Sequence, residues 1–160
     1  MNAEGGRFTL DANLLVYSVD NAAGTRHRLA REIVDRAVEC GCWLTLQALG
    51  EFYVAATRKG MAPPVEAAAQ AADWLDVFPT VAASPAAVRA ALAEAAAGRT
   101  SYWDALLIAT AAEAGCTAVL TEDMSDGSVL SGVRVHNPFT PTGELTETAR
   151  QLLYLADLDP

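Results

Sequence analysis

Four acidic residues have the chemistry and the placement of a site for a divalent cation. They come from well separated parts of the 160-residue chain: Asp11, Glu51, Asp104 and Asp123. Carboxylate oxygens without Cys or His favour Mg²⁺ or Mn²⁺, and such an ion can generate a hydroxide for an in-line displacement. We interpret Asp11 and Asp104 as the most direct metal ligands and Asp123 as completing the site. Glu51 would hold or deprotonate the water.

The predicted elements around two of these acids place them on the same edge of a sheet. Ser101 has the type and spacing of a helix cap for the helix that contains Asp104. Gly115 suits the left-handed position that ends such a helix. Ala118–Leu120 is a short apolar run, typical of a strand covered on both faces, and Asp123 follows it. Helix N-termini and strand C-termini lie along one edge of a doubly wound sheet, so Asp104 and Asp123 should be neighbours.

The other two acids follow the same rule. Arg7–Leu10 reads as a strand, and Asp11 closes it and can cap the helix 12–19. Trp43–Leu46 reads as a second strand, and Glu51 lies about one turn inside the helix that follows. Each acid alone could be a helix cap or a surface residue. Four together on one edge would repel one another without a cation, and this repulsion should raise some of their pKa values.

The remaining pattern alternates helices with strands, which predicts an α/β fold with a mainly parallel sheet. Expected helices are a segment from a Thr25 cap to about Cys40, an alanine-rich segment Val65–Leu75, and a segment capped by Ser84 that runs to Ala97. Two more strands are expected, a weak edge strand around Pro79 formed by Val77, Phe78 and Val81, and a last strand Val133–Val135.

Composition predicts one compact domain in a reducing compartment. The chain is 52% hydrophobic and 19% charged, and its apolar runs are shorter than the roughly 18 residues of a membrane span. Met1–Gly6 does not resemble a secretory signal. The three cysteines, an odd number, fit ordinary buried or loop thiols rather than a disulfide framework. We therefore expect a cytoplasmic protein without membrane attachment.

The net charge of −9 argues against nucleic-acid binding, but two features soften this objection. Bound cations would neutralise the four acids locally. Basic residues also cluster, with four on one predicted helix and two at the end of another: Arg26, Arg28, Arg31, Arg36, Arg58 and Lys59. A solvated helix face is the simpler interpretation of these clusters. Packing is likewise the simpler interpretation of the aromatic residues. Trp103 could stack on a base, but such a residue more often packs against the protein. Tyr17, Phe52 and Tyr53 are expected in the core.

Four segments, in this order, resemble the PIN-domain ribonucleases, above all the VapC-like toxins of bacterial type II toxin–antitoxin pairs. They read D-A-N-L-L-V-Y from Asp11, L-G-E-F-Y around Glu51, S-Y-W-D-A-L-L-I-A-T-A-A-E-A-G-C from Ser101, and T-E-D-M-S-D-G from Thr121. The resemblance spans roughly Phe8–Phe139. It implies a three-layer α/β/α sandwich with a central sheet of four to five strands. It also implies a metal-dependent endoribonuclease that uses the four acids, with supporting roles for Asn13, Thr121 and Asp126.

The resemblance further implies an RNA substrate, a cognate antitoxin and a homodimer. We assign 1–139 to the PIN-like domain and 140–160 to a C-terminal extension, in which Thr146–Leu155 has the pattern of a helix that packs on this chain or on a partner. Two alternatives stay open, an inactive PIN-fold interaction module and a PIN-type nuclease outside a toxin–antitoxin pair. A haloacid-dehalogenase phosphatase is disfavoured because Asn13 stands where it needs a second Asp. A Rossmann or P-loop protein is excluded because its glycine fingerprint is missing.

Overall fold

The computed structural model describes residues 6–154. The strands within this range are β1 (Arg7–Leu10), β2 (Leu44–Thr45), β3 (Thr80–Val81), β4 (Cys116–Leu120), β5 (Val129–Leu130) and β6 (Val133–His136). The α-helices are α1 (Ala12–Val19), α2 (Thr25–Ala37), α3 (Leu46–Arg58), α4 (Pro64–Val77), α5 (Pro85–Ala96), α6 (Tyr102–Glu113) and α7 (Glu147–Tyr154), and a 3₁₀ turn covers Asn21–Ala23.

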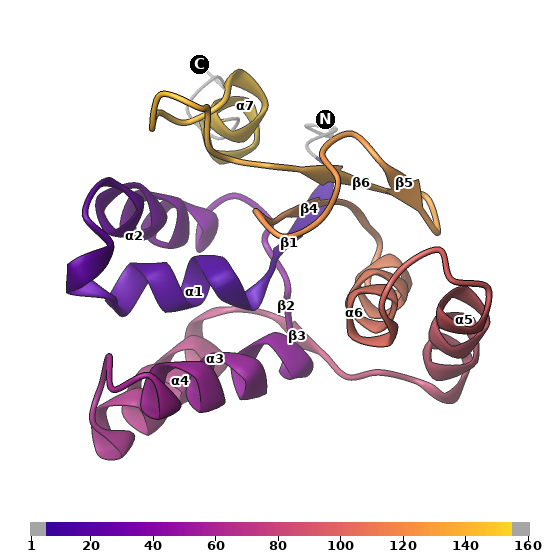
Figure 1. Cartoon of the computed structure of the whole chain (residues 1–160), viewed down its shortest axis with the longest axis horizontal. Helices are drawn as coiled ribbons and strands as arrows, with labels where there is room; N and C mark the ends of the chain where they lie inside the picture. Colours follow the sequence, from indigo (N-terminus) through magenta and orange to yellow (C-terminus); the bar gives the residue numbers. More distant parts are fainter. Residues whose placement is uncertain (1–5, 155–160) are drawn as a thin grey trace.

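The central sheet has four strands in the order β1-β4-β6-β5. Strands β1, β4 and β6 are parallel, and β5 is antiparallel to β6. Figure 1 shows α1 and α2 on one side of these strands and α5 and α6 on the other, so the expected three-layer arrangement with a mainly parallel sheet is confirmed. Strand β5 was missed, because two residues before a turn leave almost no periodicity to read.

Strands β2 and β3 form a separate parallel pair. A single bridge between Phe8 and Cys42 links this pair to β1, and the Trp43 N–H donates to the Phe8 carbonyl over 2.9 Å. The expected weak strand around Pro79 is therefore present as Thr80–Val81, but the prediction was wrong for Phe78, which caps the end of α4, and for Val77, the last residue of that helix. The Val77 side chain is exposed at the end of the helix. In the sequence, an apolar β-branched residue at this position cannot be told apart from a strand residue.

Local caps begin most of the helices where the sequence predicts. The side chains of Asp11, Ser84 and Ser101 each accept a backbone N–H in the first turn of α1, α5 and α6. Gly115, with φ +82°, follows the end of α6 as expected. The prediction for α2 was wrong: Thr25 is its first helical residue, and Gly24 precedes it without a side-chain cap bond among the described residues. Its φ of +61° suits glycine in the cap position.

The core positions the strand ends that carry the acids. Phe8, Leu10, Val119 and Leu120 are fully buried between the two helical layers, so β1 and β4 are fixed side by side. Helix α6 is buried along Ala105–Ala111 because it lies between the sheet and α5. Both strands therefore end, and α6 begins, at positions held by the packing of the whole domain.

The segment after β6 packs on the domain itself. Phe139 bridges to Leu145, and α7 contacts α2 through buried Leu153. The Cys40 thiol donates to the Leu153 carbonyl over 2.7 Å. The expected helix in the tail is therefore present as α7, and it packs on this chain through α2. The predicted end of this helix, Leu155, lies outside the described residues. The expectation of buried or loop cysteines is confirmed, because Cys42 and Cys116 are buried and Cys40 is half-buried in the turn after α2.

Among the helices of residues 6–154, none has the length and hydrophobicity that crossing a membrane requires.

Candidate active site

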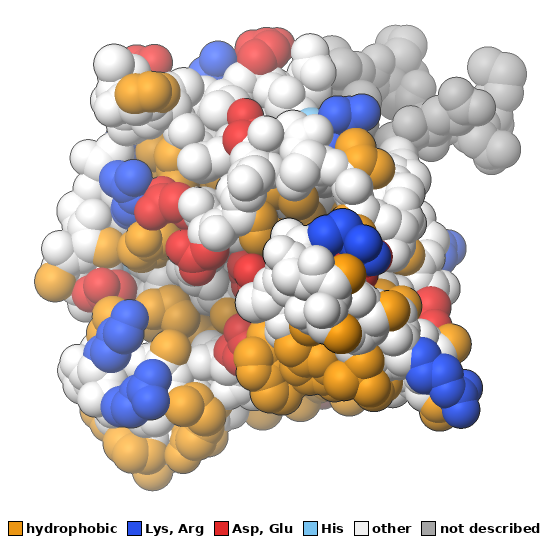
Figure 2. All heavy atoms as spheres, turned by 45° about the vertical axis from the view of Figure 1, so that its right-hand side comes forward, with side chains coloured by type: hydrophobic (Ala, Val, Ile, Leu, Met, Phe, Trp, Pro, Cys, Tyr) orange, Lys and Arg blue, Asp and Glu red, His pale blue; other side chains and the backbone are white. Residues whose placement is uncertain are grey.

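The four acids predicted from the sequence line one pocket of about 320 Å³. Asp11 follows β1, Asp104 lies in the first turn of α6, and Asp123 follows β4 in the β4–β5 loop. Glu51 reaches the same pocket from α3, which begins directly after β2. The space-filling view shows acidic side chains gathered around the hollow in the middle of this face (Figure 2). The parallel topology thus brings together acids that lie up to 112 residues apart, Asp11 and Asp123.

Asp11 is held by two hydrogen bonds on different oxygens. The Ala12 N–H donates to Oδ1 over 2.7 Å, which caps α1, and the Thr121 hydroxyl donates to Oδ2 over 2.7 Å. The Asp11 N–H in turn donates to the Leu120 carbonyl over 3.0 Å. Only 8% of the residue is exposed, so the carboxylate has a fixed orientation at the base of the pocket.

Burial raises the pKa of Asp11 from its usual 3.8 to about 6. The hydrogen bonds from Thr121 and Ala12 oppose this rise because they favour the charged form. Repulsion from Asp104 and Glu51 adds to it, but burial is the largest cause. The sequence led us to expect a raised pKa from crowding of the acids. The direction is right for Asp11, whereas the main physical cause is loss of water around a carboxylate packed beneath the helix it caps.

Thr121 connects three of the predicted residues. Its hydroxyl donates to Asp11 and accepts from the Asn13 side-chain amide over 3.2 Å and from the Asp123 N–H over 3.1 Å. The Asn13 Oδ1 is buried and has no hydrogen-bond partner among the described residues, although Asn13 lines the pocket. This leaves an acceptor oxygen beside the acids that a cation or its water can satisfy.

Glu51 and the start of α6 are joined by Gln47, a residue that sequence reasoning missed. The Gln47 side-chain amide donates to Glu51 Oε1 over 2.7 Å and to the Trp103 carbonyl over 3.0 Å. It therefore orients the Glu51 carboxylate and ties α3 to the turn that contains Asp104. The position one helical turn before Glu51 was the signal that could have identified Gln47, because residues four apart face the same side.

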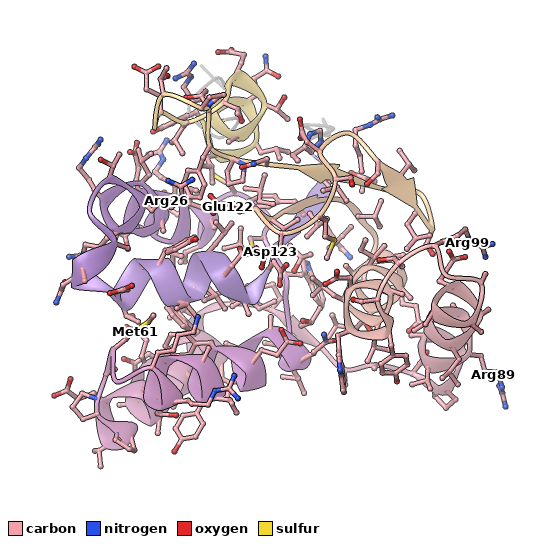
Figure 3. The ribbon with its side chains drawn as sticks, viewed as in Figure 1. Arg26, Met61, Arg89, Arg99, Glu122 and Asp123 are labelled. Carbon is pink, nitrogen blue, oxygen red and sulfur yellow. The ribbon has the colours of Figure 1, made fainter. Side chains whose placement is uncertain are left out.

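Asp126, the third supporting residue predicted from the sequence, lies outside the pocket. Its carboxylate accepts the Asn137 N–H over 2.9 Å and so fastens the β4–β5 loop to the end of β6. The other end of the loop is held by Glu122, which accepts from Arg26 over 2.7 Å and from the Tyr17 hydroxyl over 3.0 Å. Figure 3 shows Arg26 and Glu122 side by side, next to Asp123. These contacts fix the loop that presents Asp123.

Six further residues line the pocket without having been singled out as site residues, and the largest of them are Tyr17, Lys59 and Met61. Lys59 is the basic side chain in the lining of the pocket. The sequence indicated only that it belongs to the basic pair Arg58–Lys59 at the end of a predicted helix. Two aromatic predictions need correction. Tyr53 was placed in the core but is exposed, because its position on α3 faces away from Phe52. Trp103 does not pack inside either, since 61% of it is exposed.

The residues present fit a hydrated divalent cation. The atoms around the pocket that could bind a metal ion are carboxylate and amide oxygens, the ligands that Mg²⁺ and Mn²⁺ prefer. Within residues 6–154, no three His, Cys, Asp or Glu side chains are grouped as a ready metal cage.

Comparisons with known proteins agree with the fold. Two similar solved structures both have a TM-score of 0.57. VapC20 from Mycobacterium tuberculosis, described as a sarcin–ricin loop cleaving toxin, is 18% identical over 70% of this chain and 86% of its own. VapBC2 from Rickettsia felis, bound to a DNA fragment from their promoter, is 12% identical over 82% of this chain and 98% of its own.

No curated protein matches the sequence closely enough to count as a relative. The family model for the PIN domain, however, matches residues 8–125, which include all four acids and most of the described chain. The resemblance read from the motifs is therefore confirmed, and the chain belongs to the PIN domain family.

Proposed function

We propose that the protein is a metal-dependent endoribonuclease and the toxin of a toxin–antitoxin pair. The observation that carries this proposal is the pocket at the carboxyl edge of the sheet, where four carboxylates from four segments meet. Gathering these charges lowers the stability of the fold, because Asp11 is buried and lies near other acids. A purely structural role would not need such a cluster. Intact acids also argue against an inactive interaction module.

Each acid has a role that its surroundings support. Asp11, Asp104 and Asp123 would hold Mg²⁺ or Mn²⁺, and Glu51, oriented by Gln47, would hold or deprotonate the attacking water. A bound ion would supply charge stabilisation and a lowered pKa for that water. Thr121 keeps Asp11 and Asp123 in register, and Asn13 offers its free oxygen to the same hydration shell. Asp126 acts at a distance, through the loop.

We propose single-stranded or loop RNA as the substrate. The description of VapC20 as a sarcin–ricin loop cleaving toxin supports a looped strand. Lys59 at one side of the pocket supplies a positive charge that can meet a backbone phosphate beside the acids.

We propose two protein partners, an antitoxin and a second copy of the chain. An Arg or Lys on an antitoxin segment could form charge-assisted hydrogen bonds with the carboxylates of the pocket and so block it. For the homodimer, the support is an exposed apolar groove of about 650 Å³ between α3 and α6, which Val54 and Trp103 line. Light scattering at high micromolar concentration tests the dimer, and a monodisperse monomer would count against it.

The enzymatic proposal is tested with purified protein and a single-stranded RNA. We expect cleavage with Mg²⁺ or Mn²⁺ and none with EDTA. Asp104→Asn should lower the rate by at least about 100-fold, since metal and water activation supply much of the catalysis. The matched control is Asp73→Asn, which changes an exposed acid on α4 outside the pocket and should keep the wild-type rate. Equal rates for the wild type and Asp104→Asn would sink the proposal.

A further inference from the structure

A second pocket adjoins the proposed catalytic pocket on the far side of two acids. It has a volume of about 350 Å³, and Asp104 and Asp123 line both pockets. Figure 3 shows Asp123 near the centre of the molecule and Arg99 beyond it, over the end of α5. A group bound here would thus sit immediately beside whatever is bound at the four acids.

One part of the second pocket is apolar and firmly packed. Ile108 and Val135 belong to α6 and β6 and are almost fully buried, and Leu130 of β5 packs partly against the same core. These side chains come from three elements of the rigid domain, so this wall is already formed. Ile108 and Val135 form the floor of this part, and the more exposed Leu130 and Val129 present the apolar surface that suits the flat face of an aromatic ring. The volume lies near the lower end of the range of about 300–1,000 Å³ for ligand pockets.

The other part of the pocket offers a donor and an acceptor side by side, and 62% of the Arg99 side chain and 21% of the Glu94 side chain are exposed. Arg99 donates through Nε to Glu94 Oε2 over 2.7 Å and through Nη2 to Oε1 over 2.9 Å. This two-point pairing orients both planar groups, while Arg99 Nη1 and the outer lone pairs of Glu94 remain available for a ligand. A donor beside an acceptor is the pattern that matches the edge of a nucleobase.

The charges favour a neutral base over a phosphate at this place. The charge of Arg99 is offset by Glu94 at contact distance, and Asp104 and Asp123 add two carboxylates at the boundary of the pocket. A phosphate would therefore meet three acids and one cation. A base carries no net charge, so it can use the hydrogen-bonding edge and the apolar wall without this repulsion.

We propose that the second pocket takes the unstacked base of the nucleotide next to the scissile phosphate, and that the Arg99–Glu94 pair reads its edge. The pocket then determines which base stands beside the cut. This inference rests on the proposed ribonuclease function, because the neighbouring acids must hold the scissile phosphate.

The test maps cleavage sites in a pool of single-stranded RNA with a randomised segment, cut by the full chain in Mn²⁺ and read by sequencing. We expect the wild type to favour one base at one position beside the cut by about ten-fold, the scale of a good two-point base contact. Arg99→Ala and Glu94→Gln should each reduce that preference below about two-fold. Preferences at other positions should persist.

Arg89→Ala is the matched control. Arg89 is an exposed arginine of α5 outside the second pocket, and its side chain extends away from the molecule in Figure 3. It should keep the wild-type preference. A second probe fills the pocket: Ser128→Phe, at an exposed lining residue, should slow cleavage of the favoured RNA about ten-fold and that of disfavoured RNA far less.

Each outcome separates the two proposals. If the wild type cuts RNA with the same preference as Arg99→Ala and Glu94→Gln, or cuts without preference, the base pocket is overturned and the ribonuclease stands. If both variants lose preference equally at every position, a general binding role replaces base reading and the inference also fails. If the wild type cuts no RNA with Mg²⁺ or Mn²⁺, the proposed function is overturned and this inference with it.

Discussion

The Thr121 hydroxyl donates to Asp11 Oδ2 over 2.7 Å, and this contact joins the ends of two parallel strands across 110 residues. Both residues are at least nine-tenths buried. The bond opposes the burial that raises the pKa of Asp11, because it favours the charged carboxylate.

The first prediction removes this bond. Thr121→Val keeps the side-chain shape and loses the hydroxyl, so the buried Asp11 carboxylate, the Asn13 side-chain amide and the Asp123 N–H each lose a partner. We expect the free energy of unfolding to fall by about 1–3 kcal/mol. The pKa of Asp11 should rise further, which moves the acidic limb of the cleavage rate to higher pH. Thr121→Ser retains the hydroxyl and should retain most of the stability and the pH profile.

The second prediction concerns metal-free stability and pH. The folded state holds a proton on Asp11 more tightly than the unfolded state, because burial raises its pKa from 3.8 to about 6. Stability therefore falls as pH rises from about 4 to 6, and the loss at neutral pH is about 3 kcal/mol at about 1.4 kcal/mol per pKa unit. Asp11→Asn removes the charge, and its amide oxygen can still accept one of the two hydrogen bonds.

We therefore expect Asp11→Asn to melt higher than the wild type at pH 7.5 in EDTA. The difference should shrink as the pH falls through 6 and should vanish below about 4, where the wild-type acid becomes protonated in both states. Thermal melts of both proteins across this range provide the measurement, with Asp73→Asn as the control. If Asp11→Asn melts lower at pH 7.5, the lost hydrogen bond outweighs the relief of burial.

The third prediction tests Gln47 as a positioning residue. Gln47→Leu keeps the size of the side chain and frees Glu51 and the Trp103 carbonyl. We expect kcat to fall about 10–100-fold with little change in KM, since misplacing a catalytic group by about 1 Å costs on this scale. The control is Gln151→Leu, because Gln151 also donates to a Glu one turn earlier, on α7, outside the pocket. Equal kcat values for the two variants would refute the assignment.

The fourth prediction concerns the metal. If Mg²⁺ binds with a dissociation constant of about 1 mM, then ~10 mM stabilises the wild type by roughly 1.4 kcal/mol. This corresponds to a rise in Tm of about 3–6 °C for a domain of this size. Asp104→Asn should show a much smaller rise. Equal Mg²⁺ shifts in the two proteins, measured against EDTA, would place Asp104 outside the metal site.

The sequence was informative where structure depends on nearby residues. Ser84 and Ser101 begin helices as expected because a cap bond joins residues three apart. The expectation failed for Thr25, where the turn before α2 puts Gly24 in the cap position. It also failed for Tyr53, because helical spacing alone does not tell which flank of an apolar face the next layer will cover.

The sequence by itself determined that four acids meet at one edge of the sheet. Alternating strands and helices predict a mainly parallel sheet with right-handed crossovers, and in that topology strand ends and helix starts share an edge. Tertiary structure alone decided how deeply Asp11 is buried, that Thr121 and Gln47 hold the acids, and that Arg99 and Glu94 flank a second pocket beside them. These features depend on the distance and packing between elements that are remote in the chain, and local patterns carry no information about either.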